Sequence, residues 1–451
     1  MSALEQAYRY SHASFISDDA KPRLTLATTD ATGEQHPHFF EGRILQPRLV
    51  AELLTAVHLI VGARFFTPAN TLARTLALAD PVVTSGGGLL RFEGFSSCCS
   101  AYVRADLLPA AYDGEVVGKG TTNVDFNAPM RAALARVRDD AGLGLSVGSD
   151  ALSLHSGGTQ VTERKVALPL RWLRGMVEVQ SYQAGMRQRL EANAVEAMRF
   201  FRTLPKSSTS KTPLWVSRTA TGLVAGTRAG TNAVRVTDST RLRVLQPLLP
   251  KARALRVYAD EAQQSSAWVL DFGDSRLTLA LSAEVWRGFS GEGQALWALI
   301  QAETDDVAAA TRRMRAQLQW QPTLDAQALA IELALPLRIV ADSLRVLGAS
   351  GLAGYDVSSG HYFHRVLPFD LSMIDDMHPR LSDARALLEA NAAQVVCAAP
   401  FEATVSSGGV LHRVRDIDGE LRCTCPWFAK HRGDRGPCKH ALAAAVLRAS
   451  P

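Results

Sequence analysis

The sequence contains little cysteine and no long apolar run. Six cysteines in 451 residues are too few for a disulfide scaffold of this size. The most apolar segment, residues 49–61, is interrupted by Glu52 and His58 and falls short of the about 18 apolar residues of a membrane helix. The first ten residues lack the basic stretch and apolar core of a secretion signal. We therefore expect a cytoplasmic protein without membrane contact, whose cysteines are reduced.

The charge is nearly balanced, with 49 Lys and Arg against 44 Asp and Glu and a formal net charge of +5. A chain of this length that coated nucleic acid over its whole surface would be more basic. Any basic site must therefore be local. At 47% hydrophobic and 21% charged residues the composition is that of a globular protein, and the length suggests about two to four domains.

The pattern of the chain predicts a multidomain α+β protein. A Ser-, Lys- and Pro-rich run, residues 204–213, follows a helical pattern at 182–203 and precedes short alternating runs typical of strands. We predict a boundary there. The expected domains are a mixed α/β N-terminal region of unknown role (1–205), a small β-rich domain (214–303), a winged-helix-like segment (305–370) and a C-terminal helix followed by a metal-binding module (378–451).

The third of these regions has the element order of a winged helix-turn-helix. Two helices are expected at 325–334 and 337–347, followed by a hairpin that carries His361, His364 and Arg365. On the second helix Asp342 would repel DNA phosphates, so we favour protein docking over direct DNA contact for this segment.

The strongest pattern lies near the C-terminus. Cys423 and Cys425 are separated by one residue, twelve residues follow, and then come Cys438 and His440. Three thiolates and one imidazole are a ligand set for tetrahedral zinc. A hairpin around Asp418–Gly419 would deliver the first pair of ligands, and the first turn of a helix the second pair. Because all four positions are protein ligands, the one zinc ion expected here is structural.

The other interpretation of these cysteines is that they are buried and unliganded. It is the weaker one, because two thiols would flank a polar residue on one hairpin by chance. The remaining cysteines fit that interpretation better: Cys98 and Cys99 are adjacent in a predicted strand and so face opposite sides. Cys397 lies in the apolar run 395–399 and is expected to be buried.

The Cys-x-Cys and Cys-x-His pattern resembles the SWIM zinc finger over residues 411–447, including Trp427 and an apolar helix at 441–446. The arrangement of the chain is similar to that of bacterial SWIM proteins with a large N-terminal region and a helix-turn-helix-like segment. The resemblance implies DNA binding or protein–protein interaction. It also implies two partners, a MoxR-type AAA+ ATPase and a protein with a von Willebrand factor A domain.

The loop between the ligand pairs is basic. Residues 421–448 contain six Lys or Arg and one Asp. Candidate contacts to nucleic acid or to a partner are Lys430, Arg432, Arg435 and Lys439; the alternative is an ordinary solvated loop.

We therefore expect a zinc-binding adaptor and not an enzyme, because no catalytic motif such as Gly-x-Ser-x-Gly or His-Glu-x-x-His occurs. The alternative is an enzyme whose active site lies in the N-terminal domain, with the zinc finger as a targeting module.

Overall fold

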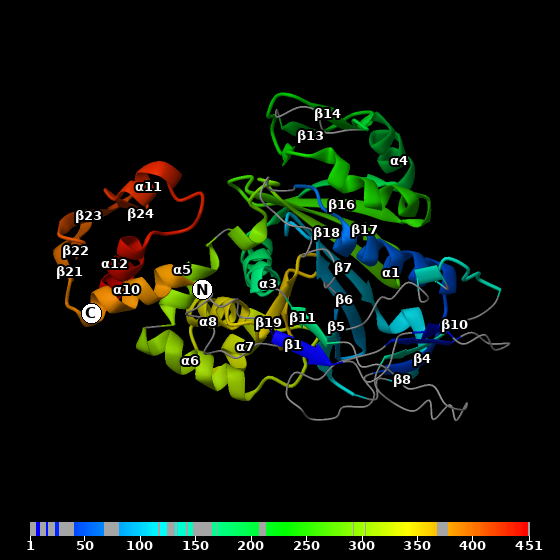
Figure 1. Ribbon diagram of the computed structural model, residues 1–451, viewed down its shortest axis with the longest axis horizontal. Coiled ribbons are helices and arrows are strands. Elements are labelled where there is room, and N and C mark those ends of the chain that lie inside the picture. Colours follow the sequence, from blue (N-terminus) through cyan, green and yellow to red (C-terminus); the bar gives the residue numbers. More distant parts are fainter. Residues whose placement is uncertain are drawn as a thin grey trace.

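A computed structural model gives the architecture of the protein (Figure 1). It describes residues 6–9, 15–16, 23–26, 40–66, 81–115, 118–123, 131–132, 134–140, 143–147, 165–168, 170–206, 213–291, 293–302, 304–367 and 378–449. Helices and several sheets occur along the chain, so the predicted α+β class is confirmed. None of the helices in these ranges is both long and apolar enough to cross a bilayer.

An eight-stranded antiparallel sheet forms the centre of the molecule (Figure 1). Its strands, in spatial order, are β12 (Arg187–Asn193), β16 (Ala254–Ala259), β17 (Ser265–Asp271), β18 (Ser275–Ser282), β7 (Ala101–Leu107), β6 (Leu89–Phe95), β5 (Val82–Gly86) and β9 (Gly120–Asn123).

This sheet takes strands from both sides of the predicted boundary at 204–213. Strand β18 pairs with β7 along seven residue pairs, from Ser275–Leu107 to Leu281–Ala101. The regions 1–205 and 214–303 therefore share one sheet, although the sequence placed them in separate domains. Alternation reveals a strand but not its partner, and these two partners lie far apart in the chain. Part of the predicted linker, 207–212, lies outside the described residues.

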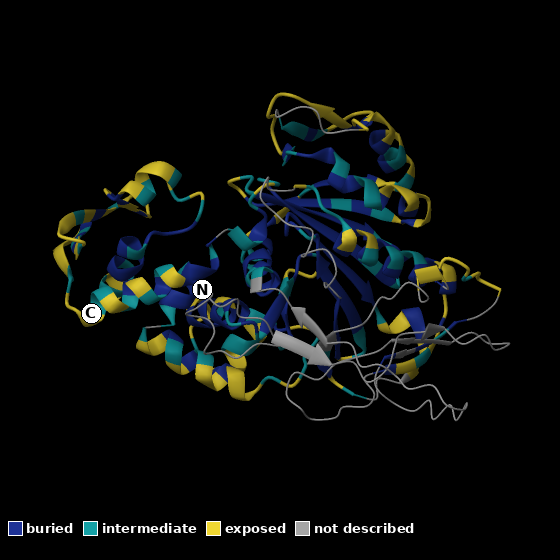
Figure 2. Cartoon of the chain, in the orientation of Figure 1, coloured by how far each residue is buried: buried dark blue, intermediate teal, exposed yellow. Residues whose placement is uncertain are grey.

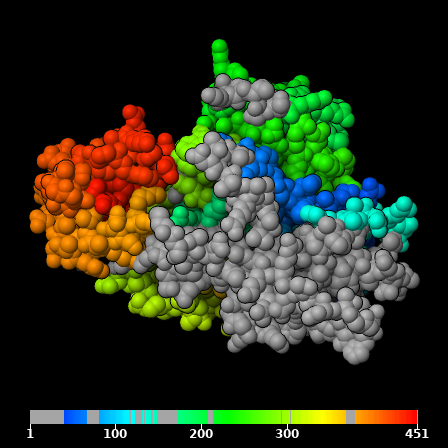
Figure 3. All heavy atoms as spheres, in the orientation of Figure 1, coloured from blue at the N-terminus to red at the C-terminus, as the bar shows by residue number. Residues whose placement is uncertain are grey.

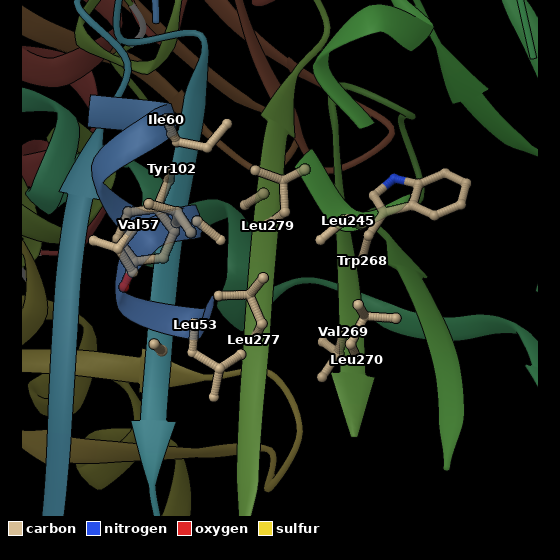
Figure 4. Packing of buried hydrophobic residues seen from close by; sticks show 14 of the residues in the cluster. Leu53, Val57, Ile60, Tyr102, Leu245, Trp268, Val269, Leu270, Leu277 and Leu279 are labelled. Atoms are coloured by element: carbon tan, nitrogen blue, oxygen red, sulfur yellow. The ribbon is translucent and has the colours of Figure 1, made fainter. Parts of the chain in front are cut away.

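One face of the sheet is apolar. Helix α1 (Pro47–Gly62) lies over β6 and β7 and contacts the 3-10 segment η3 (Ser239–Lys251). Figure 4 shows Leu53, Val57 and Ile60 of α1 in the same buried cluster as Leu277 and Leu279 of β18. Because side chains alternate along a strand, the residues between these point to the other face.

Smaller sheets surround this core. Five strands form the order β2-β3-β10-β4-β8: Phe15–Ile16, Arg23–Leu26, Leu143–Val147, Phe40–Ile44 and Tyr112–Glu115. Strands β1 (Gln6–Arg9) and β11 (Lys165–Leu168) pair, and β14 (Gly222–Gly226), β13 (Leu214–Thr219) and β15 (Val234–Val236) form a third sheet. The strands predicted between 214 and 282 are therefore present.

The prediction of one helix at 182–203 is wrong for the middle of that segment, which is a strand. Helix α3 (Leu170–Ala184) ends early, strand β12 follows, and α4 (Ala194–Thr203) then begins behind an Asn193–Glu196 capping box. Leu190 and Ala192 of β12 are buried and their neighbours are not, which is the period of a strand. Pairing with β16 overrides the helix-forming residues of this segment.

Helices and a hairpin occur in the region predicted to resemble a winged helix. They are α6 (Asp305–Ala316), α7 (Ala326–Leu333), α8 (Leu337–Ala349), β19 (Ala353–Asp356) and β20 (His361–His364). Helix α8 is buried along much of its surface, including Asp342, which the sequence placed facing outward. Asp342 instead pairs with Arg345 at 2.6 Å.

The hairpin β19–β20 lies against the second, polar face of the large sheet. Asp356 binds Arg104 at 2.8 Å and Arg276 at 3.2 Å. Arg365, just after β20, binds Glu93 at 2.7 Å. His364 and Arg365 are buried, so they are not on the exposed wing that the sequence suggested. The ion pairs fix the hairpin to strands from distant parts of the chain.

The C-terminal residues form a separate lobe, coloured orange to red in Figure 3. Its elements are α10 (Pro379–Glu389), the sheet β21 (Ala393–Ala398), β22 (Phe401–Ser407), β23 (Val410–Ile417) and β24 (Glu420–Cys423), and then α11 (Pro426–His431) and α12 (Lys439–Ala449). Leu442 of α12 and Leu381 of α10 pack with Leu296 of α5 (Ala295–Gln301). The other side of α12 covers the sheet through Ala441 and Ala444.

Cys397 is exposed, which contradicts its predicted burial. It lies on β21, the edge strand of this sheet, where Val395 and Val396 are also exposed. The apolar run therefore marks an edge and not a core strand. Cys98 and Cys99 are buried, as expected, but they lie in the turn between β6 and β7 and not in a strand.

The ion pairs beneath the hairpin predict a stability effect. Burial alone would raise the pKa of Asp356, but Arg104, Arg91 and Arg276 hold it well below its ordinary value. Asp356→Asn should lower the free energy of unfolding near pH 7 by about 3–5 kcal/mol, because it leaves the single carboxylate of Asp106 to balance the buried Arg91 and Arg104. The contribution of this carboxylate is complete above its ordinary pKa and decreases as the pH falls below it, so the loss should be smaller near pH 3.

Urea denaturation at the two pH values measures this difference. Glu420→Gln is the matched control, since Glu420 forms a surface pair with Arg422 at 3.4 Å and should change stability by less than about 1 kcal/mol. Equal losses in the two variants would contradict the assigned role of Asp356.

Candidate metal centre

The first two ligands of the predicted set lie at the end of a hairpin. Strands β23 and β24 are joined at Asp418–Gly419, both with positive φ, as the sequence predicted for a tight turn. Cys423 ends β24, and its register partner is the buried Val414. Cys425 is the N-cap of α11, followed by Pro426 at a position where proline starts a helix readily.

The second pair of ligands lies at the start of α12. Cys438 directly precedes this helix and His440 lies in its first turn. Both are buried because α12 is covered by the sheet on one side and by α10 and α5 on the other. The helix thereby presents a sulfur and an imidazole to the end of the hairpin.

The four ligand atoms converge. Those of Cys423, Cys425, Cys438 and His440 all lie within 4.8 Å of one another, and the Cys423 Sγ is 3.8 Å from the His440 Nδ1. Ligands at about 2.0–2.3 Å from a tetrahedral zinc ion are separated by about 3.5–3.8 Å. The cluster therefore fits one zinc ion, with Nδ1 as the ligating nitrogen of the histidine.

Backbone groups around the cluster favour thiolates. The Phe428 N–H donates to the Cys425 Sγ at 3.4 Å, and the Ala441 N–H donates to the Cys438 Sγ at 3.4 Å. Each donor belongs to the first turn of a helix, where the helix dipole also favours negative charge. Such hydrogen bonds hold the sulfurs in the charged form that zinc requires.

The thiols also affect one another. Hydrogen bonding with Cys423 and then Cys438 lowers the pKa of Cys425, whereas the same contacts with Cys425 and then Cys438 raise the pKa of Cys423. The neighbouring thiols thus stabilise the thiolate of Cys425 and keep Cys423 in its protonated form. All three ionise together only if a cation neutralises them, which is the role of zinc here.

The loop between the ligand pairs is tied to the body of the protein. Gly436 has φ +71°, and a Cβ there would lie 2.2 Å from the Gly293 carbonyl oxygen. The Arg435 Nη2 donates to the Gly291 carbonyl oxygen at 3.2 Å. The close approach that glycine permits in this loop is therefore to a segment of the same chain, just before α5.

Only half of the predicted basic contact residues face solvent. Lys430 and Arg432 are exposed. Arg435 is turned toward Gly291, and Lys439 forms an ion pair with Asp383 of α10 at 3.4 Å. The basic tip of the loop is accordingly smaller than the sequence suggested.

Sequence reasoning did not identify Arg380 as part of this region. Its Nη1 donates to the carbonyl oxygens of Arg435, at 2.8 Å, and Pro437, at 2.7 Å. Its guanidinium carbon also lies 4.6 Å from the centre of the Trp427 ring. No local pattern reveals these contacts, because Arg380 is far from the loop in sequence.

Two solved structures are distantly similar to this chain. One is the crystal structure of Proliferating Cellular Nuclear Antigen from Entamoeba histolytica, with 9% identity, a TM-score of 0.34, and coverage of 54% of this chain and 98% of that chain. Another is the crystal structure of the C. crescentus beta sliding clamp with bound PEG, with 14% identity and a TM-score of 0.33. That match covers 54% of this chain and 65% of the clamp, which is less than two thirds of the clamp's length. TM-scores this low carry no structural or functional weight.

No curated protein matches the sequence. The family model of the SWIM zinc finger, however, matches residues 414–448, which include β24, the four clustered ligands and all of α12 but its last residue. Pattern, geometry and family model therefore agree: the chain carries a SWIM zinc finger whose ligands for one zinc ion are Cys423, Cys425, Cys438 and His440.

Proposed function

We propose that the protein is an adaptor whose zinc-stabilised C-terminal lobe binds another protein. The observation that carries this proposal is the exposed outer surface of the sheet β21–β24. Figure 2 shows much of these strands as exposed. The zinc ion holds this surface in place and takes no part in a reaction, because the four protein ligands complete its coordination.

The outer surface combines apolar and arginine side chains. Val396 on β21 is 59% exposed and Leu411 on β23 is 67% exposed. Arg413 and Arg415 on β23 lie within 2.8 Å of Glu402, so their charges are partly neutralised. Exposed apolar residues beside arginine are typical of protein interfaces, whereas paired arginines contribute less to phosphate binding.

The winged-helix-like segment supports the same choice. The hairpin β19–β20 is held against the large sheet by Asp356, and α8 is largely buried. A wing and a recognition helix must both be exposed to bind DNA. We therefore propose that this segment connects the sheet to the zinc lobe and does not read DNA.

DNA binding by the finger is the second candidate, favoured by the exposed Lys430 and Arg432 of the loop. Such a tip would make few phosphate contacts, so binding would be weak and would decrease as salt increases. The candidate protein partners remain those implied by the family resemblance, an AAA+ ATPase and a von Willebrand factor A-domain protein.

Affinity capture with the zinc-loaded full chain, with and without nuclease, tests the proposal. Val396→Asp and Leu411→Asp should each reduce capture of a protein partner at least about tenfold, because a charge would be placed in a desolvated interface. Ile331→Asp is the matched control, since Ile331 is 83% exposed on α7, away from the sheet. Capture that disappears with nuclease and is unaffected by the two variants would contradict protein binding.

Titration of double- and single-stranded DNA at two salt concentrations tests the second candidate. If the loop binds phosphates, Lys430→Glu combined with Arg432→Glu should abolish the salt-dependent binding. Unchanged binding in this double variant would exclude the loop as the contact.

The zinc site predicts that folding of the C-terminal lobe, and not of the large sheet, depends on the metal. Cys425→Ser should remove stoichiometric zinc and open the C-terminal lobe, because structural zinc supplies about 10–16 kcal/mol of folding free energy in isolated fingers. The large sheet should persist, since its core lies in a separate cluster of buried residues. Elemental analysis and limited proteolysis measure the two effects.

Cys397→Ser is the matched control, because Cys397 is an exposed thiol of the same lobe outside the ligand cluster. First cleavage of Cys425→Ser should fall within residues 411–448. Cleavage spread evenly over the chain, or full zinc content in this variant, would contradict the assignment.

A further inference from the structure

A cavity of about 490 Å³ lies where the zinc lobe meets the rest of the protein. Its walls come from α3, from the segment around Gly291, from the start of α10 and from the loop between the ligand pairs. Three of the four zinc ligands, Cys425, Cys438 and His440, also line it, so the cavity borders the zinc site. Small-molecule sites have volumes of about 300–1,000 Å³ and often lie between structural units. The size and place of this cavity are therefore those of a ligand site.

The cavity walls carry more positive than negative side chains. Arg174, Arg380, Arg435 and Lys439 line it, against the carboxylates of Glu178 and Asp383. The zinc ion with its three thiolates adds one further negative charge, which leaves the walls positive. An anion is the ligand that such a surface favours.

The two carboxylates already have partners. The Glu178 Oε2 accepts from the backbone N–H groups of Gln294, at 2.9 Å, and Ala295, at 3.3 Å, at the start of α5. Asp383 and Lys439 pair at 3.4 Å and neutralise each other, so the positive charge of the walls comes from Arg174, Arg380 and Arg435. Burial, Arg174 and Arg380 lower the pKa of His378, on the same wall, to about 4, so it is neutral near pH 7.

An aromatic side chain forms the apolar part of the cavity. Two guanidinium groups contact the Trp427 ring, with the Arg380 carbon 4.6 Å and the Arg435 carbon 5.2 Å from its centre. Leu296 and Pro379 add further apolar surface. The cation–π contacts hold the arginines at the wall, in a fixed arrangement before any ligand binds.

We propose that this cavity binds a small organic anion, with a carboxylate or phosphate head on an apolar body. The head would lie near the arginines and the apolar body against Trp427 and Leu296. The site is separate from the outer surface of the sheet, so the proposal does not depend on protein binding there.

Ligand-observed NMR of the zinc-loaded full chain tests this site with benzoate and phenyl phosphate, each against a neutral partner, benzamide and phenol. At least one anion should bind with a dissociation constant below about 1 mM, and at least about tenfold more tightly than its neutral partner. Comparison of the two anions distinguishes a carboxylate from a phosphate ligand. No binding of either anion at millimolar concentration, or equal binding of anion and neutral partner, would overturn the proposal.

Variants locate the binding. Arg435→Gln should weaken anion binding at least about tenfold, whereas Arg432→Gln, an exposed arginine of the same loop outside the cavity, should leave it unchanged. Ser290→Phe keeps every charge but fills space at the wall, and should weaken binding of all four probes. Zinc content is measured in each variant to confirm folding. Equal effects of Arg435→Gln and Arg432→Gln, or unchanged binding in Ser290→Phe, would place the anion elsewhere.

Discussion

Three thiolates cannot lie within a few ångströms of one another unless a cation neutralises them, and the C-terminal lobe is built around that requirement. The sulfurs come from the end of a hairpin, the start of α11 and the residue before α12. Thr424 alone joins the first two of these elements, whereas residues 426–437 separate them from the second pair of ligands. Metal binding therefore fixes the angle between the sheet and α12, and with it the surface that the lobe presents.

Much of what depends on neighbouring residues could be predicted from the sequence. The spacing of Cys423, Cys425, Cys438 and His440 gave the ligand set, and Asp418–Gly419 gave the turn, because one hairpin and one helix hold all of these. The short strands after residue 213 follow from alternation for the same reason. Patterns of neighbouring residues therefore predict the structures that those same residues form.

Features that depend on distant partners could not be predicted in this way. Strand β12 is composed of residues that favour a helix, and only pairing with β16 makes it a strand. The sequence predicted that Arg435 and Lys439 are solvent-facing charges, but Arg435 donates to the Gly291 carbonyl and Lys439 pairs with Asp383. Arg365 likewise resembled a wing residue, yet it binds Glu93 inside the molecule. In each case the deciding contact is far away in the chain.

The contact between Gly436 and Gly293 has a mechanical consequence. Two backbones that touch without side chains between them leave no rotamer to absorb a shift, so movement of one must displace the other. Gly293 lies two residues before α5, the helix that packs against α10 and α12 of the lobe. Loss of the metal would thus displace the start of α5 first, at the junction between the lobe and the rest of the protein.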